Sequence, residues 1–270
     1  MALSHCHGIT RDKTSPVKTM PKRLYNASSH GTLMAGYDAW AETYDRDVQD
    51  FGYATPDAVA AAVCRHFPKR DARLLDLGAG TGLLGEKLYG RGYRNLVGMD
   101  GSHGMLTQAC RKGTYRLLCR MALGRPLGFP DHYFDGLLAA GVYTPGHAPP
   151  DSLFELSRIL RPGGLVIFSL KWNGGFKEDV LAILQQMKDT AGWHCQSWSA
   201  AYRSWPWADE TQEARVLVYK QAGRSIGNGP RPSPTVARMV RDRQSDGNVP
   251  KERPLDFAGR RTKNPRPRFR

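Results

Sequence analysis

A short apolar segment that runs into three closely spaced glycines constrains this chain more than any other feature. Residues 74–82 read Leu-Leu-Asp-Leu-Gly-Ala-Gly-Thr-Gly, and helical spacing of apolar residues resumes at Leu83. Glycine permits positive φ angles and lets a bound molecule approach the backbone closely. Open α/β sheets bind ligands in the crevice beyond the carboxyl ends of their strands. The pattern therefore predicts a buried strand, a tight turn and a helix, with a ligand held at the turn.

Two acidic residues accompany this turn. Asp76 lies near the end of the predicted strand, and Asp100 closes the next predicted strand, 20 residues after Gly80. Asp76 is placed where a carboxylate can hold an ammonium group of a ligand. Asp100 is placed where a carboxylate accepts hydrogen bonds from both hydroxyls of a ribose. The alternative for Asp100 is an acid that only caps the following helix.

Apolar strands alternate with amphipathic helices through the middle of the chain. Strands are predicted at residues 73–77, 96–100, 115–119, 134–140 and 165–170, and helices at 58–67, 83–89, 102–111, 152–160 and 177–190. This alternation is typical of βαβ units, which form a mostly parallel sheet with helices on both faces. Ser102 and Asp151 are the expected N-caps of two helices. The alternation of strands and helices ends after residue 190. Residues 193–205 and 214–219 are two predicted strands joined by polar residues, which predicts a closing antiparallel hairpin.

The net charge of +14 is concentrated at the two ends of the chain. Residues 1–35 hold five basic and one acidic side chain, and residues 221–270 hold thirteen basic and four acidic ones. Residues 36–220 hold 21 basic and 20 acidic side chains, so this body is nearly neutral. Nucleic-acid binding needs clustered positive charge, so we expect nucleic acid to bind, if at all, only through the basic tail.

Composition divides the chain into three segments. Residues 1–35 are expected to be a flexible basic segment, and residues 36–220 a single folded domain. Residues 221–270 are rich in Arg and Pro, and their apolar residues are too scattered to form a core. Such a segment does not offset its ordering entropy by burial, which predicts a disordered tail.

The cysteines and the hydropathy pattern indicate an intracellular protein. The five cysteines are odd in number and scattered, which predicts neither a disulfide framework nor a metal site. We find no apolar window of membrane-spanning length and no apolar signal region at the N-terminus. We expect a monomer in the cytoplasm, with the nucleus as the alternative compartment and no membrane partner.

A dinucleotide-binding oxidoreductase is an alternative interpretation of the glycines. Residues 80–85, Gly-Thr-Gly-Leu-Leu-Gly, match the dinucleotide fingerprint formally, with Asp100 at the expected later position. Three features argue against NAD. The first glycine of that match comes two residues late, Asp76 would repel a pyrophosphate, and no second folded domain of useful size is expected after residue 220.

The strand, the glycines and the two acids, followed in order by Phe134-Asp135 and Pro162-Gly163-Gly164, resemble class I S-adenosylmethionine-dependent methyltransferases. The resemblance covers about residues 36–220. Within that class the chain is most similar to the methyltransferase-like protein 27 family, through residues 37–45, 83–86, 100–106 and 146–147. The resemblance implies a Rossmann-like, seven-stranded sheet in the order 3-2-1-4-5-7-6 whose last strand is antiparallel. It also implies methyl transfer with S-adenosyl-L-methionine as cofactor.

Carried over by position, the resemblance assigns cofactor-binding residues. Those expected around the methionine moiety are Asp76, Gly78, Ala79, Gly80 and Gly82. Those expected around the ribose, the adenosine and the rest of the cofactor are Asp100, Gly101, Met105, Met121, Ala122 and Gly141. Met121 departs from the family, because relatives often place there an acid that contacts the adenine amino group. That departure keeps a second alternative open, a catalytically silent protein that binds S-adenosylmethionine.

Three aromatic residues mark a predicted N-terminal helix. Tyr37, Trp40 and Tyr44 fall at positions i, i+3 and i+7, which is typical of a stripe packed on a core. The resemblance gives them a second role, as a lid over the sulfonium of the cofactor, because aromatic faces attract cations.

The catalytic residues and the methyl acceptor are less well determined by the sequence. Methyl transfer from a sulfonium needs mainly proximity and orientation, and a general base helps only when the acceptor must lose a proton. Tyr143 and His147, which follow the fourth strand, are the candidates for that base. The alternative for His147 is a residue that merely lines a loop. We expect a small-molecule acceptor first and a protein side chain second.

Overall fold

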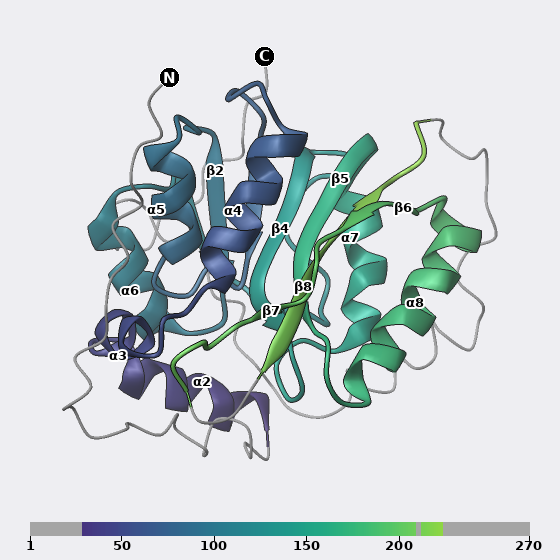
Figure 1. Cartoon of the computed structure of the whole chain (residues 1–270). Helices are drawn as coiled ribbons and strands as arrows, with labels where there is room; N and C mark the ends of the chain where they lie inside the picture. Colours follow the sequence, from purple (N-terminus) through teal and green to yellow (C-terminus); the bar gives the residue numbers. More distant parts are fainter. Residues whose placement is uncertain (1–28, 209–211, 224–270) are drawn as a thin grey trace, which may run out of the picture.

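The computed structural model describes residues 29–208 and 212–223. A single mixed sheet forms its centre, in the order β3-β2-β1-β4-β5-β8-β6, with β7 paired to β8 outside this path (Figure 1). The strands are β1 (Leu74–Leu77), β2 (Leu96–Asp100), β3 (Leu117–Arg120), β4 (Phe134–Tyr143), β5 (Leu160–Lys171), β6 (His194–Trp198), β7 (Tyr202–Arg203) and β8 (Glu213–Lys220). The first five strands are parallel, and β8 runs antiparallel to both of its principal neighbours.

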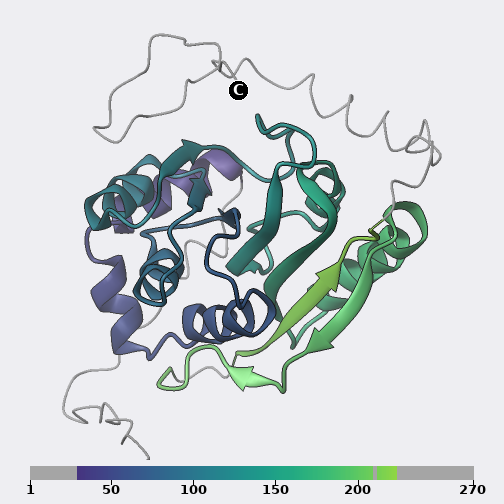
Figure 2. The same cartoon turned by 90° about the horizontal axis from the view of Figure 1, so that it is seen from above.

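Helices cover both faces of the sheet. They are α2 (His30–Trp40), α3 (Tyr44–Asp50), α4 (Thr55–His66), α5 (Leu83–Gly90), α6 (His103–Lys112), α7 (Leu153–Ile159) and α8 (Phe176–Ala191), with a short 3-10 helix η1 (Pro150–Ser152) before α7. Seen from above, the sheet runs between α4 and α8 (Figure 2). The predicted α/β fold and the predicted sheet order are confirmed. The strand count differs, because the predicted strand at 193–205 forms β6 and β7.

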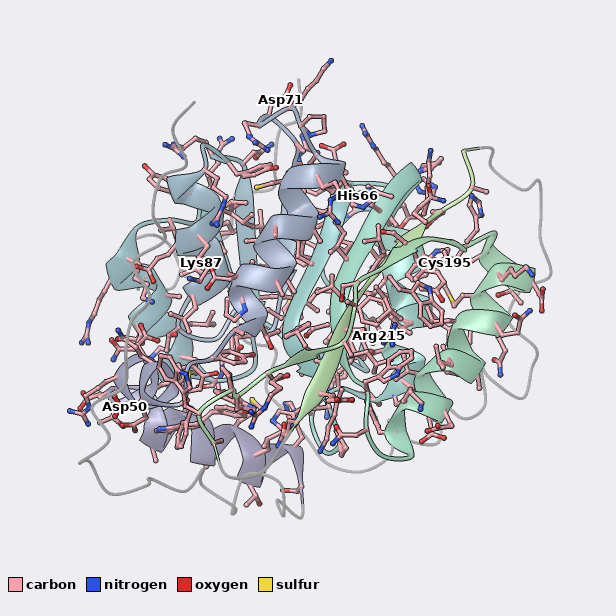
Figure 3. All side chains as sticks on the ribbon, viewed as in Figure 1. Asp50, His66, Asp71, Lys87, Cys195 and Arg215 are labelled. Carbon is pink, nitrogen blue, oxygen red and sulfur yellow. The ribbon has the colours of Figure 1, made fainter. Side chains whose placement is uncertain are left out.

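The alternation of side chains along each strand builds two cores. Successive residues of a strand point to opposite faces, so Leu75 and Leu77 pack in the core beneath α7 and α8. Leu74 packs on the other face with residues of α4 and α5. Asp76 lies between the two leucines of the first face and is therefore directed to the α4–α5 side. Lys87 of α5, labelled in Figure 3, forms an ion pair with Asp57 of α4 at 2.8 Å, which joins the two helices of that layer.

Two local predictions are wrong for identifiable reasons. The strand predicted at residues 165–170 begins five residues earlier, because residues 161–164 form an irregularity inside β5, where the pairing with β4 shifts register and Gly163 has a φ of 74°. Asp151 is not the N-cap of α7, because Pro150 starts a 3-10 turn that includes Asp151. Ser152 then precedes α7 without a side-chain capping bond. The predicted cap at Ser102 is confirmed, since its side chain accepts a hydrogen bond from the Met105 amide.

The N-terminal aromatic residues lie on two helices, so the prediction of one helix is wrong. Trp40 ends α2 and Tyr44 begins α3, with a turn between them. The Thr43 hydroxyl donates to Asp47 at 2.7 Å in the first turn of the new helix. Both helices lie at the lower edge of the sheet in Figure 1. α2 also begins at His30, six residues before the predicted domain boundary.

The basic segments cannot be compared with these elements. Residues 1–28 and 224–270, which contain most of both predicted basic segments, lie outside the described residues. Within residues 29–208 and 212–223, we find no helix with the length and apolarity to cross a membrane.

A glycine in the central strand gives a direct test of this packing. A Cβ atom at Gly136 of β4 would lie 2.6 Å from the Phe67 ring and 2.8 Å from Leu74, so Gly136→Ala should lower the free energy of unfolding by about 1–3 kcal/mol. At Gly90 a Cβ would meet no atom within 4 Å, so Gly90→Ala should leave stability unchanged or raise it by up to about 1 kcal/mol. Urea denaturation measures both, and equal losses in the two variants would contradict the packing argument.

Candidate active site

The glycine turn after β1 depends on backbone angles that favour glycine. Gly78, Gly80 and Gly82 have φ angles of 65°, 55° and 89°. A Cβ atom at Gly78 would also lie 2.6 Å from the Val142 side chain. The loop is tied to β2 by the Ala79 amide, which donates to the Met99 carbonyl at 2.9 Å. The turn is thus narrow, and its amides face the carboxyl end of β2.

Asp100 joins this turn to the next helix. One oxygen of its carboxylate accepts from the Gly80 amide at 2.9 Å, and the other accepts from the Ser102 amide at 2.8 Å. Burial raises the pKa of Asp100, while the Ser102 and Gly80 amides act in the opposite direction. The N-cap of α6 is Ser102, so Asp100 does not serve only as a helix cap. Asp100 connects the glycine turn to the segment before α6 at the ligand crevice.

Asp76 is buried beneath the turn, with 3% of its surface exposed. Its carboxylate accepts a hydrogen bond from the Tyr115 hydroxyl at 2.6 Å, and that hydroxyl accepts from the Gly85 amide at 3.1 Å. Burial raises the pKa of Asp76 to about 7, the hydrogen bond from Tyr115 lowers it, and the charge of Asp100 raises it. Tyr115 was missed from the sequence, because nothing local shows that a residue 39 positions away reaches Asp76.

A cavity opens above the turn, and we name it the cofactor cavity. It collects most of the residues predicted from the sequence: Gly78, Gly80, Asp100, Gly101, Met105, Met121, Ala122, Gly141, Tyr37, Tyr44 and His147. Asp76 and Ala79 line a smaller adjoining cavity, together with Gly78 and Gly80. Gly82 lines none of these cavities, and its role is to let the chain enter α5.

Several residues of the cofactor cavity were missed from the sequence. Those contributed by α2, by the α3–α4 connection and by the strand ends are His30, Leu33, Met34, Tyr53, Met99, Leu123, Ala140, Val142 and Ala148. Leu33 precedes Tyr37 by four residues, so helical spacing was an available signal for the α2 residues. The strand-end residues carried no such signal, because they read as ordinary core.

Carboxylates fasten α2 and α3 over the cavity. Asp38 of α2 accepts from the Ser102 hydroxyl at 2.5 Å and from the Gly104 amide at 2.8 Å. An acid is favourable there, because α6 begins with unpaired amides and a positive dipole end. Asp45 of α3 accepts from the Thr81 hydroxyl at 2.5 Å and pairs with Lys112 at 2.6 Å. Both helices are therefore held against the glycine turn and α6.

A tyrosine–histidine pair crosses from α2 to the loop after β4. The Tyr37 hydroxyl and Nε2 of His147 are 2.6 Å apart. Nδ1 of His147 lies 3.1 Å from the Pro145 carbonyl, which can only accept a hydrogen bond, so we assign the ring proton to Nδ1. Nε2 is then an acceptor, and Tyr37 donates to it. Burial lowers the pKa of His147, which favours this neutral form.

Two predicted residues are separated from the cofactor cavity. Tyr143 is fully buried and forms a hydrogen bond with the Ser152 hydroxyl at 3.2 Å. It lines neither the cofactor cavity nor either of the two smaller cavities beside it. The side chain packs against Phe168 in the core, so its placement contradicts the role of a general base. Trp40 is 6% exposed and donates its indole N–H to Asp47 at 2.9 Å. Trp40 lines a different cavity beside the cofactor cavity, and Tyr37 and His147 also line that cavity.

Comparison with known proteins places the chain in a family. A family model described as a methyltransferase domain matches residues 75–168. Human (Homo sapiens) methyltransferase-like protein 27 is 35% identical over 163 residues, which are 58% of this chain and 66% of that protein. The phosphatidylethanolamine N-methyltransferase of Cereibacter sphaeroides is 30% identical over 166 residues, 58% of this chain and 81% of that enzyme.

The chain belongs to the class I S-adenosylmethionine-dependent methyltransferases.

Solved structures agree with this class at the level of the fold. An S-adenosylmethionine-dependent methyltransferase of Thermotoga maritima superposes with a TM-score of 0.51 at 15% identity, over 71% of this chain and 99% of that one. A 1,6-didemethyltoxoflavin-N1-methyltransferase of Burkholderia thailandensis, solved with S-adenosylhomocysteine, superposes with a TM-score of 0.50 at 20% identity, over 73% and 91%. The chain spans just under two thirds of the human relative's length.

The residues of this methyltransferase suit S-adenosylmethionine, its cofactor. The carboxylate of Asp100 at the cavity edge suits a ribose, and the thioethers of Met99, Met105 and Met121 offer an apolar surface for an adenine ring. Met121 occupies the position where the family often has an acid, so the adenine amino group has no carboxylate there. The NAD alternative finds no support, because the matched family is a methyltransferase and Asp76 lies directly under the turn.

The pKa of Asp76 predicts how cofactor binding depends on pH. If the ammonium group of the cofactor binds the charged carboxylate, a folded-state pKa of about 7 means that binding below pH 7 must release a proton. Affinity for S-adenosylhomocysteine should then rise about tenfold from pH 6 to pH 8 and flatten above pH 8. Tyr115→Phe removes a hydrogen bond that lowers the pKa of Asp76. In this variant the rise in affinity should therefore occur at higher pH.

Calorimetry at several pH values makes this measurement. Asp76→Asn cannot titrate and serves as the control, so its affinity should be weaker and nearly independent of pH. An affinity for S-adenosylhomocysteine that is equally flat in the wild type would contradict an ammonium contact with Asp76.

Proposed function

We propose that this methyltransferase acts on a small molecule bound beside the cofactor cavity. The observation that supports the proposal is the cavity that Tyr37, Trp40 and His147 line beside the cofactor cavity, which we name the acceptor cavity. Its walls come from α2, the β4 loop, the end of β5 and the segment before β8, and include Tyr37, Trp40, Tyr53, His147, Lys171 and Trp205. Tyr37, Tyr44, Tyr53, Gly141 and His147 line both cavities, so the two adjoin.

The position of this cavity suits in-line methyl transfer. The cofactor supplies an already activated methyl group, so the chain has mainly to orient the acceptor and exclude water. The tyrosine faces at the junction favour a cationic sulfonium. The lining of the acceptor cavity combines aromatic side chains with a few polar groups, as is usual for small-molecule sites. A protein side chain is the second candidate, but it would have to pass beneath α2 and α3, which carboxylates fasten to α6.

His147 is placed to act as a general base in this reaction. It lies at the junction of the two cavities, and the hydrogen bond to the Pro145 carbonyl directs its unprotonated Nε2 toward Tyr37. An acceptor with an O–H or N–H group would lose its proton to Nε2, either directly or through the Tyr37 hydroxyl. Thr144 adds a contact of 2.9 Å to Nδ1 and helps to fix the ring.

Transfer of a labelled methyl group tests the proposed substrate class. We expect tritium from S-adenosylmethionine to enter the small-molecule fraction of a cell extract, separated from the macromolecules by ultrafiltration. Asp100→Ala removes the carboxylate that holds both loops, so it should lower transfer at least tenfold, about 1.4 kcal/mol. Label in the protein fraction would favour a side-chain acceptor instead. Tight cofactor binding without transfer to either fraction would indicate a catalytically silent protein.

Substitution of the tyrosine–histidine pair tests the general base. With the acceptor from the labelling experiment, His147→Ala should lower kcat by about 10²–10⁴. The wild-type rate should fall only on the acid side of neutrality, because burial lowers the pKa of His147 and keeps it neutral at pH 7. Tyr37→Phe keeps the imidazole and should lose less activity.

Affinity for S-adenosylhomocysteine, measured in parallel, separates a loss of cofactor from a loss of proton transfer. A His147→Ala enzyme with an unchanged pH–rate profile would remove His147 from the mechanism.

A further inference from the structure

The end of β5 places a lysine in the acceptor cavity. Lys171 is the last residue of the strand, and its partner in the antiparallel ladder is Ala214, which also lines that cavity. Two residues earlier on the same strand face, the Ser169 hydroxyl accepts from the Gly141 amide at 2.8 Å. Gly141 borders the cofactor cavity. Lys171 therefore lies at the end of the acceptor cavity farther from the glycine turn, about 7 Å along the strand from Ser169.

Lys171 is the only lysine or arginine that lines these three cavities in the described part of the chain. Its side chain forms no hydrogen bond, ion pair or ring contact with another residue of the described part of the chain. Two nearby cations contact the Trp172 ring instead. The Arg215 guanidinium, on β8 in Figure 3, lies 4.6 Å from the ring centroid, and the Lys177 ammonium lies 5.3 Å from it. A half-buried lysine that shares a cavity with aromatic residues is thus available to pair with an anion.

Most of the remaining large side chains in the lining are aromatic. Tyr53 and Trp205 stack with ring centroids 4.1 Å apart, and Trp205 is 7% exposed. The ring centroids of Tyr37 and Trp40 lie 6.4 Å apart, with 21° between the ring planes. Planar side chains of this kind favour a planar ligand, through stacked and edge-to-face contacts. Ser204 and Gln212 add polar atoms to the lining.

We propose that the methyl acceptor is an aromatic acid, whose ring lies among Tyr37, Tyr53 and Trp205 and whose carboxylate pairs with Lys171. This inference rests on the proposed function and specifies its substrate class. With the carboxylate at Lys171, the opposite edge of the ring faces Gly141 and His147, where the cofactor cavity begins. A phenolic or amino group at that edge would lie beside the base and the methyl donor. Charge pairing in a partly dry cavity also discriminates strongly against neutral analogues.

Binding of matched acid and amide probes tests the assignment. Benzoate, 2-naphthoate, indole-3-acetate and the three corresponding neutral amides are titrated by calorimetry into the protein, with and without saturating S-adenosylhomocysteine. We expect the wild type to bind at least one acid tenfold or more tighter than its amide. Lys171→Met should abolish that preference while leaving the affinity for the amide unchanged, and Lys171→Arg should retain it. Lys188→Met, on the exposed face of α8, is the matched control and should behave as the wild type.

The outcomes separate this inference from the proposed function. Equal affinity for acids and amides in the wild type, or a preference that survives in Lys171→Met, would overturn the role of Lys171. Failure of S-adenosylhomocysteine to bind would instead overturn the cofactor site, and the probe titrations without it would still decide on Lys171. Once the acceptor is identified, Lys171→Met should raise its KM tenfold or more and change kcat less, because Lys171 lies away from the base.

Discussion

The carboxylate of Asp100 is the contact on which the rest of this site depends. It binds the Gly80 amide of the glycine turn and the Ser102 amide before α6, and so holds two chain segments at the carboxyl ends of β1 and β2. Backbone amides at such places are otherwise unpaired. Because the turn requires positive φ angles, only a glycine-rich sequence can bring its amides to that carboxylate. The cofactor cavity exists because these two segments are kept in register.

The N-terminal helices complete the site from outside the sheet. Asp38 and Asp45 dock α2 and α3 onto α6 and the glycine turn, and this docking places Tyr37 over both cavities. A single pair of helices therefore closes the cofactor cavity and forms one wall of the acceptor cavity. Tyr37 and His147 line both cavities, so occupation of one cavity is expected to influence the other.

The electrostatics of the two cavities are opposite in sign. Asp76 and Asp100 place carboxylates at the cofactor end, whereas Lys171 places an ammonium at the far end of the acceptor cavity. The net charge of residues 36–220 does not show this separation of charges, because their 21 basic and 20 acidic side chains nearly cancel. The proposed function therefore depends on where single charges lie and on the burial of their surroundings, not on the net charge.

The sequence by itself determined the α/β class, the glycine turn and the acids beside it, because each is written in local spacing along the chain. The order of the strands in the sheet followed from the resemblance to class I methyltransferases. Only the tertiary structure decided that Tyr143 is buried, that Tyr115 binds Asp76, and that Tyr37 meets His147 across 110 residues. It also divided the aromatic stripe between two helices. Periodicity reports which face of an element is apolar, but not which distant residue will pack against that face. Lys171 stayed hidden for the same reason: a lysine at a strand end looks solvent-exposed until the walls of its cavity are in place.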